Sequence, residues 1–169
     1  MRPGRRISAA AFVAVALVAA FVLLEALSGG GAEPRGRAAP ALPREVLKPP
    51  RVSLASLRGH PVLVNFWASW CGPCKREARH LAEVSHRLPR GAALVGVDWN
   101  DGTSGARSFI RRYGWSFPNL RDGDGTVGND FGLSGLPNTF VLDSRGRIVR
   151  RLIGPQTVSS FERALRSVE

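Results

Sequence analysis

The hydrophobic positions of this chain change their spacing from segment to segment, and the changes predict alternating strands and helices. Two short runs, residues 61–67 (PVLVNFW) and 92–98 (AALVGVD), are almost continuously apolar. Such runs are typical of strands that are covered on both faces of a sheet. Further along, residues 139–143 and 148–153 are expected to pair as a hairpin across the turn Ser144-Arg145-Gly146.

Between these strands, apolar residues recur at the three- to four-residue spacing of a helix. Residues 75–88 and 157–168 each place apolar side chains on one face and charged side chains on the other. Residues 104–113 are predicted to form another helix. Residues 127–131 are predicted to form a short helical segment after the loop Asp122-Gly123-Asp124-Gly125.

The predicted order of elements is β–α–β–α–β–β–α after an N-terminal extension. This order favours an α/β fold with a central mixed β-sheet flanked by helices. A short edge strand is expected at residues 52–54, and residues 114–119 are expected only to turn the chain. We therefore predict one folded domain over residues 51–169.

The N-terminal region differs in composition from the rest. Residues 1–6 (MRPGRR) are basic, and the apolar run that follows, residues 7–24, is long enough to span a bilayer. We expect a cytoplasmic n-region at residues 1–6 and a transmembrane signal-anchor at residues 7–27, which places the rest of the chain on the extracytoplasmic side. The alternative is a cleaved signal peptide, for which Ala26-Leu27-Ser28 would be a weak cleavage site.

Residues 28–50 are rich in Gly, Ala, Pro and Arg and have no hydrophobic periodicity. They are predicted to be a linker between the anchor and the domain. The folded domain would then lie at the outer face of the cell membrane on a single-pass anchor, or be secreted if the signal were cleaved. We expect a monomer.

The chain is strongly basic, with 24 Lys and Arg residues against 13 Asp and Glu residues. In the predicted domain the basic residues are scattered, apart from Arg111-Arg112 and Arg150-Arg151, and the sequence has no aromatic-rich basic stretch. This pattern argues against a nucleic-acid partner. It is compatible with a basic face near anionic lipid headgroups, or with the ordinary solvated surface of an arginine-rich protein.

The candidate chemistry lies in Trp70-Cys71-Gly72-Pro73-Cys74-Lys75, which contains the only two cysteines of the chain. A Cys-x-x-Cys pair at a helix N-terminus can close and reopen a small disulfide ring. The helix dipole favours a thiolate there, so Cys71 is predicted to be the nucleophile and Cys74 the thiol that resolves a mixed disulfide. Pro73 suits the first helical turn, where its missing N–H costs little.

Two other interpretations of the pair are weaker. A structural disulfide rarely closes so short a loop, because the stabilisation grows with loop length. A closed zinc site needs four ligands, and only His60, His80 and His86 could complete one. We therefore expect no metal, and no cofactor beyond the redox-active disulfide Cys71–Cys74.

Two segments together resemble a known family. Residues 65–74 (NFWASWCGPC) and 135–143 (GLPNTFVLD) are similar to membrane-anchored thioredoxin-like proteins, and most of all to the cytochrome c maturation thiol reductases of the TlpA, ResA and CcmG (DsbE) type. The segment from Asp122 to Gly132 is similar to the CcmG (DsbE) pattern. The resemblance covers about residues 51–168, and it implies a thioredoxin-like fold and thiol-disulfide oxidoreductase activity.

The resemblance also implies a substrate-binding surface beside the disulfide. Pro137 matches the cis-proline that faces the disulfide in thioredoxin folds, which would leave the backbone of Leu136 free to pair with an extended substrate. The alternative is a trans proline that opens a strand. The residues expected to contact substrate are Trp70, Gly72, Pro73, Leu136 and Pro137.

Three polar positions bear on proton transfer. Asn65 stands where cytoplasmic thioredoxin has a buried aspartate, and an amide cannot take up a proton at neutral pH. Glu77 stands where ResA-type reductases carry an acidic residue that tunes the thiols, so it is the candidate proton relay. The alternative is a first-turn carboxylate that offsets Lys75 and Arg76, or an N3 capping partner. Asp98 is expected to be an ordinary strand-end carboxylate.

The resemblance finally implies partners and a direction. The substrate would be the Cys-x-x-Cys-His motif of an apocytochrome c, reduced before haem attachment, and a membrane thiol reductant of the CcdA or DsbD type would re-reduce the protein. An oxidant of the DsbA type, or a reductase of other substrates, is the alternative, although the Gly-Pro dipeptide favours a reductant. A Cu(I) metallochaperone of the Sco type would have a three-residue spacer and a distant histidine. A peroxiredoxin would need Thr-x-x-Cys, which the sequence lacks.

Overall fold

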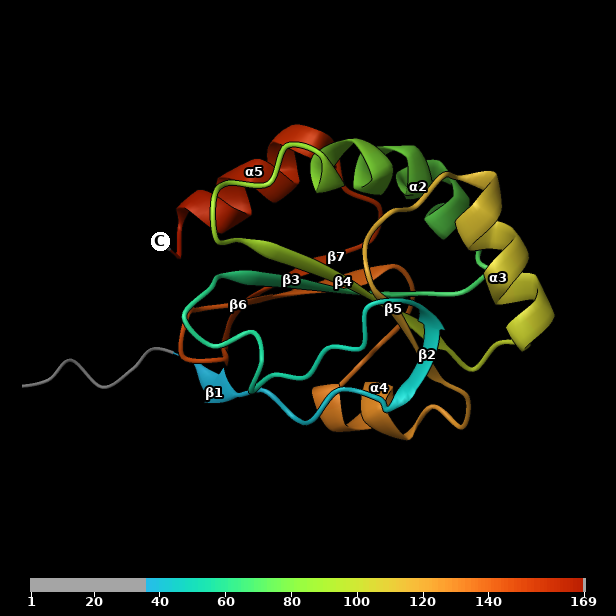
Figure 1. Ribbon diagram of the computed structural model, residues 1–169, viewed down its shortest axis with the longest axis horizontal. Coiled ribbons are helices and arrows are strands. Elements are labelled where there is room, and N and C mark those ends of the chain that lie inside the picture. The colour runs from blue at the N-terminus through green and yellow to red at the C-terminus, as the bar shows by residue number, and fades with distance from the viewer. Residues whose placement is uncertain (1–35, 169) are drawn as a thin grey trace, which may run out of the picture. The chain divides into compact units, whose positions relative to one another are not determined.

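A seven-stranded mixed sheet lies at the centre of the computed structural model, which describes residues 36–168 (Figure 1). The strands follow the order β1-β7-β6-β3-β4-β5-β2, so the two most N-terminal strands form its opposite edges. Their bounds are β1 (Arg37–Ala38), β2 (Glu45–Lys48), β3 (Val62–Trp67), β4 (Ala93–Trp99), β5 (Asn119–Asp122), β6 (Asn138–Leu142) and β7 (Arg147–Ile153).

The middle strand, β3, has a parallel neighbour on one side and an antiparallel neighbour on the other, while the edge strand β2 pairs antiparallel with β5. Strand β3 pairs in parallel with β4, which pairs in parallel with β5. On its other side β3 pairs antiparallel with β6, and β6 forms the expected hairpin with β7. The predicted α/β fold with a mixed sheet is confirmed.

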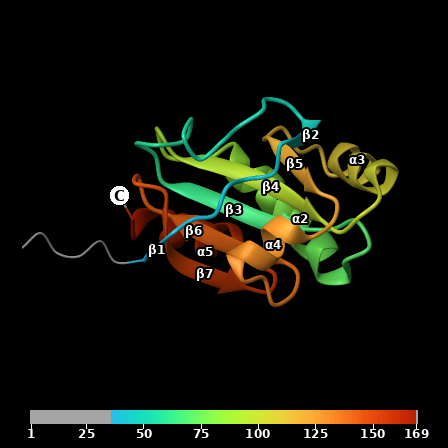
Figure 2. The same ribbon diagram turned by 90° about the horizontal axis from the view of Figure 1, so that it is seen from below.

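Helices cover the two faces of the sheet unequally. The longer helices α2 (Gly72–Ser85), α3 (Thr103–Arg112) and α5 (Val158–Arg166) lie on one face. The short helix α4 (Thr126–Phe131) lies on the other face, together with the N-terminal segment that runs across the sheet from β1 to β2 (Figure 2). The sheet is therefore covered on both sides.

Alternate residues of β3 enter the two layers. Leu63 and Trp67 belong to the hydrophobic cluster beneath α2, α3 and α5. Val64 and Phe66 belong to the cluster on the other face, which includes Phe131 of α4. All six residues of β3 are buried, which explains why this segment is almost continuously apolar.

The N-terminal part of the domain differs most from the prediction. Residues 36–50, which their composition assigns to a linker, contribute β1 and β2 to the sheet, where they pair with β7 and β5. Leu42 and Leu47 in this segment are buried. The folded domain begins at about Gly36 rather than at residue 51, so the prediction of a linker is wrong from residue 36 onward. Strands of two and four residues are too short to show a period in the sequence.

Two smaller predictions also differ from the structure. Residues 52–54 do not form an edge strand. Strand β5 occupies part of a region expected to be only turn and loop, and it pairs with both β4 and β2. Its sequence, NLRD, contains two charged residues and no apolar run, so its neighbours rather than its own pattern make it a strand.

The predicted n-region and signal-anchor, residues 1–27, lie outside the described residues, as does the start of the predicted linker. Among residues 36–168, no helix has the length and apolar character needed to cross a bilayer. The anchor stays a prediction.

The variant Leu42→Ala tests whether the N-terminal segment is part of the folded domain. Leu42 is 8% exposed and belongs to the same hydrophobic cluster as Phe66. Its truncation should lower the free energy of unfolding by about 2–3 kcal/mol, because the removed methyl groups leave a cavity. The exposed neighbour Arg44 supplies the control, since Arg44→Ala should change stability by less than about 0.5 kcal/mol. Urea unfolding of the full chain measures both variants. Equal changes in the free energy of unfolding for Leu42→Ala and Arg44→Ala would show that the segment does not pack on the sheet.

Candidate active site

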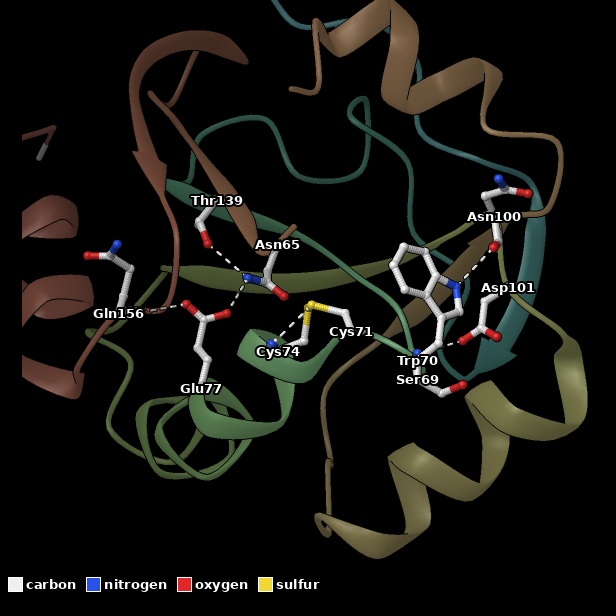
Figure 3. The surroundings of a disulfide bond; sticks show 10 residues. All are labelled: Asn65, Ser69, Trp70, Cys71, Cys74, Glu77, Asn100, Asp101, Thr139 and Gln156. Atoms are coloured by element: carbon white, nitrogen blue, oxygen red, sulfur yellow. Dashed lines mark hydrogen bonds between the residues drawn. A yellow bond between two sulfur atoms is a disulfide. The ribbon is translucent and has the colours of Figure 1, made fainter. Parts of the chain in front are cut away.

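The loop between β3 and α2 carries the first cysteine and is held in place on both sides. Trp67, the last residue of β3, is fully buried among aromatic side chains. The backbone N–H of Ser69 donates a hydrogen bond to Asp101 Oδ2 at 2.6 Å (Figure 3). The indole N–H of Trp70 donates to the carbonyl of Asn100 at 3.2 Å. The loop after β4 therefore supports the loop that delivers the cysteines.

Cys71 and Cys74 form a disulfide at the start of α2, with their Cα atoms 5.2 Å apart. Cys71 is the N-cap residue, and its Sγ accepts a hydrogen bond from the backbone N–H of Cys74 at 3.1 Å. Pro73 lies in the first turn, as expected from its missing N–H. After reduction, the same N–H and the helix dipole would stabilise a thiolate on Cys71, which supports its predicted role as the nucleophile.

The rim around the disulfide comes from the cysteine loop and from the loop that precedes β6. Trp70 is 56% exposed, Gly72 is exposed and Pro73 is half-buried. Leu136 packs against the cluster that contains both cysteines, and the Leu136–Pro137 peptide bond is cis, as predicted. Within residues 36–168 the backbone of Leu136 makes no hydrogen bond to another backbone group. It is therefore free to pair with an extended peptide.

Glu77 lies one turn beyond Cys74 and is only 1% exposed. Its Oε1 accepts a hydrogen bond from the backbone N–H of Gln156 at 2.8 Å, and its Oε2 accepts one from Asn65 Nδ2 at 3.0 Å (Figure 3). The same amide nitrogen donates to Thr139 Oγ1 at 2.9 Å. Burial raises the pKa of Glu77 to about 7, although both hydrogen bonds to the carboxylate oppose the rise.

This placement decides between the interpretations of Glu77. A surface carboxylate would lie beside Lys75 and Arg76, which are both exposed, whereas Glu77 is buried against Asn65. The N3 capping position is occupied by Cys74, because α2 begins at Gly72. Both alternatives are therefore wrong. With a pKa near neutrality, Glu77 can hold or release a proton where the amide of Asn65 cannot.

Asp98 is a buried group rather than the ordinary strand-end carboxylate expected from the sequence. It is 0% exposed, and neither carboxylate oxygen has a hydrogen-bond partner within residues 36–168. Burial, reinforced by the negative charge of Asp101, raises the pKa of Asp98 to about 8. A signal was present, since alternation along β4 places Leu94, Gly96 and Asp98 on the face covered by the long helices. Because Asp98 stands between apolar residues at the end of the run, this signal was not recognised as a buried titratable group.

Within residues 36–168, no three His, Cys, Asp or Glu side chains are grouped so that they could hold a metal ion. The chemistry that the described residues present is a disulfide pair with a titratable carboxylate behind it. Its position after the central strand, at the same end of the sheet as a cis-proline, is that of the thioredoxin-like thiol-disulfide oxidoreductases.

Comparison with known proteins leads to the family. The sequence model of the AhpC/TSA family matches residues 36–151, and the chain belongs to this family. The chain is 38% identical over 125 residues to the thiol:disulfide interchange protein HelX of Rhodobacter capsulatus, which covers 72% of this chain and 69% of that protein. It is 43% identical over 124 residues to the thiol:disulfide interchange protein DsbE homologue of Paracoccus denitrificans, covering 71% of this chain and 66% of that protein.

A solved structure agrees with these relatives. The thioredoxin-family thiol:disulfide interchange protein of Chlorobium tepidum superposes with a TM-score of 0.72 at 26% identity, over 81% of this chain and 99% of that one. The chain is thus a thiol-disulfide oxidoreductase of the TlpA, ResA and CcmG (DsbE) type.

Replacement of Glu77 by Gln should remove a pH-dependent contribution to stability. Between the ordinary pKa of 4.5 and the raised pKa of about 7, the folded state holds the Glu77 proton more tightly than the unfolded state. Stability from this group is therefore complete below about pH 4.5 and is lost as the pH rises to about 7. The free energy of unfolding of the wild-type chain should fall by about 3 kcal/mol over this window, and that of Glu77→Gln should not show this fall. Urea unfolding of the oxidised chain at a series of pH values measures this difference. Glu83→Gln, at an exposed position on the same helix, is the control and should behave like the wild type. Parallel pH profiles for all three proteins would contradict the prediction.

Asp98→Asn should stabilise the protein at alkaline pH. The wild-type chain must ionise a buried carboxyl whose pKa is raised from 3.8 to about 8, so it loses stability as the pH rises through this range. At pH 8 to 9 the variant should be more stable than the wild type by several kcal/mol, and the difference should shrink toward pH 4. Thermal unfolding across this pH range measures the effect. The exposed Asp130 provides the control. If Asp130→Asn gained as much stability at alkaline pH as Asp98→Asn, the burial of Asp98 would not be the cause.

Proposed function

We propose that this protein is an extracytoplasmic reductase that keeps the Cys-x-x-Cys-His thiols of apocytochrome c reduced before haem attachment. The observation that carries the proposal is the Cys71–Cys74 disulfide, which caps α2 beside an exposed rim and a cis-proline. The resemblance to the cytochrome c maturation thiol reductases supports this substrate. The Gly-Pro dipeptide between the cysteines supports the reducing direction.

The reaction consists of two thiol–disulfide exchanges. The Cys71 thiolate of the reduced protein attacks one sulfur of the substrate disulfide, forms a mixed disulfide and displaces one substrate thiolate. Cys74 then loses its proton and attacks Cys71 Sγ, which closes the protein disulfide and releases the second substrate thiolate. The protein dithiol supplies the two electrons that the substrate gains. The two released substrate thiolates take up their protons from solvent, because Cys71 reacts as a thiolate and the proton of Cys74 stays in the protein.

Substrate binding uses the rim described above. An extended segment of the substrate pairs with the free backbone of Leu136, next to the cis-proline Pro137. Trp70, which is held by its indole hydrogen bond yet largely exposed, provides an apolar wall on the other side of the sulfur. These contacts hold the substrate disulfide in line with Cys71.

Glu77 takes up the proton that Cys74 releases. Cys74 is 2% exposed, so its proton must leave through the protein interior. Glu77 lies one turn further along the same buried face of α2, and Asn65 orients its carboxylate. A pKa of about 7 lets Glu77 accept this proton and pass it on in the next cycle.

The proposed location follows from the predicted anchor at residues 7–27, which would tether the domain to the outer face of the cell membrane as a monomer. Thiols there are not maintained by the cytoplasmic glutathione and thioredoxin pools. The oxidised protein therefore needs a dedicated electron donor, which we propose is a membrane dithiol reductant of the CcdA or DsbD type.

A trapping experiment with cysteine variants tests the exchange mechanism. Incubation of the full-length Cys74→Ser chain with an oxidised Cys-x-x-Cys-His peptide should accumulate a mixed disulfide, because no resolving thiol remains. Cys71→Ser should trap no peptide and should reduce it at least about 10³-fold more slowly than the wild type. Non-reducing gels and mass spectrometry identify the adduct. Normal turnover by both variants would exclude the proposed chemistry.

The direction of electron flow is tested by the reduction potential. A reductant should equilibrate with a dithiothreitol or glutathione buffer at a potential near the thioredoxin value of about −270 mV. A value near about −120 mV would instead make the protein an oxidant of the DsbA type. Serine substitution at both cysteines provides the redox-inactive control.

A further inference from the structure

A strongly basic hollow lies between α2 and α3, next to the disulfide. Two adjoining depressions, of about 370 and 480 Å³, share Lys75, Arg112 and Tyr113 in their walls. Ser69 of the cysteine loop lines the first of them. We call this surface the basic groove, defined by its four cationic side chains, Lys75, Arg76, Arg79 and Arg112.

The cations of the basic groove are available to an external anion. All four are exposed, and none of them forms a salt bridge within residues 36–168. The two carboxylates of α2 do not neutralise these cations, since Glu83 is paired with Arg87 and Glu77 is buried on the opposite face. Asp101, which touches the wall at Ser69, already accepts hydrogen bonds from two backbone N–H groups. The groove therefore keeps an excess of positive charge that an anionic partner would neutralise.

The groove begins at Ser69, two residues before Cys71, and extends along α2 to Arg79. Lys75 directly follows Cys74, and a rise of about 1.5 Å per residue places Arg79 about 12 Å along the helix axis from Cys71. An extended peptide covers about 3.3 Å per residue. Acidic residues about two to four positions from a partner's reactive cysteine would therefore lie over Lys75 to Arg79.

We propose that the basic groove binds an acidic polypeptide segment that flanks the reactive cysteine of a protein redox partner. The inference rests on the proposed function, because it names the chemistry of the partner that exchanges its disulfide with Cys71. A lipid surface suits the groove less well. Ser69 in its wall is only two residues from Cys71, so a membrane lying on the groove would cover the rim that a protein substrate must reach.

Two matched peptides test the proposal on the full-length chain in non-ionic detergent. Both contain the same oxidised Cys-x-x-Cys, and one carries Asp and Glu two to four positions from the cysteines where the other carries Asn and Gln. At low salt, kcat/KM for the acidic peptide should exceed that for the neutral peptide about tenfold. At about 0.5 M salt the ratio should fall below about twofold, because screening weakens the attraction.

Charge-matched variants locate the effect on the surface. The double variant Arg79→Gln with Arg112→Gln should lose most of the preference for the acidic peptide. The double variant Arg150→Gln with Arg163→Gln removes the same charge from exposed positions on β7 and α5 and should keep the wild-type ratio. A wild-type ratio near one would overturn the proposal, and so would equal ratios in the two double variants.

Two further measurements separate this proposal from the function on which it rests. If the wild type reduces neither peptide, the proposed reductase function fails, and fluorescence anisotropy with a cysteine-free acidic peptide still tests the groove. Binding about tenfold tighter to the wild type than to the Arg79/Arg112 variant supports the groove, and equal binding overturns it.

The chain is also reconstituted in vesicles of phosphatidylcholine with or without phosphatidylglycerol. If the Arg79/Arg112 variant differed from the wild type only in vesicles that contain phosphatidylglycerol, and the wild type did not prefer the acidic peptide, the proposal would be overturned and the groove would be assigned to lipid.

Discussion

The position of the active site depends on the complete burial of β3. Its six residues are buried between β4 and β6, and its two faces enter separate hydrophobic clusters. Each large apolar side chain buried in this way contributes about 1.5–3 kcal/mol. A slip of one residue would exchange the two faces and place Asn65 in the wrong layer, so the register is strongly determined. The end of β3 is fixed as a consequence, and with it the point at which the chain delivers Cys71 to α2.

Opposing electrostatic effects then act on the thiols. The N-terminus of α2 favours a thiolate by about 0.3–1 kcal/mol, and by up to about 2 kcal/mol in a partly buried site. An ionised Glu77 on the same helix disfavours that thiolate. Because burial raises the pKa of Glu77 to about 7, the carboxyl is only partly ionised at neutral pH. The proposed transfer of a proton from Cys74 to Glu77 would also keep the net charge of the interior constant, which avoids the high cost of creating an uncompensated buried charge.

The sequence predicted the parts of the fold and site that are specified locally. Strands β3 and β4 and helix α2 carry clear apolar patterns, and the cysteine motif and Pro137 were recognisable from their neighbours. Strands β1, β2 and β5 were missed, because they are short and owe their conformation to pairing with distant segments. The burial of Asp98 was missed for a related reason. The alternation along β4 places Asp98 on the face covered by the long helices, but how completely that end of the strand is desolvated depends on the distant helices and loops that cover it.

The charges on the outer face of α2 act on the same helix N-terminus that carries the cysteines. The first turn of this helix contains no acidic residue, and Lys75 and Arg76 add positive charge where the helix dipole is already positive. This arrangement is unfavourable for the isolated helix and is relieved by an anion, either the Cys71 thiolate or an acidic partner. Lys75 directly follows Cys74 in the first turns of the helix, so its charge can act on both thiol reactivity and recognition. Arg79, about 12 Å from Cys71 along the helix axis, lies beyond the Debye length of about 8 Å at physiological ionic strength. Charge at Arg79 therefore acts on the partner and has little effect on the thiol, so substrate preference can change there without altering the chemistry of the disulfide.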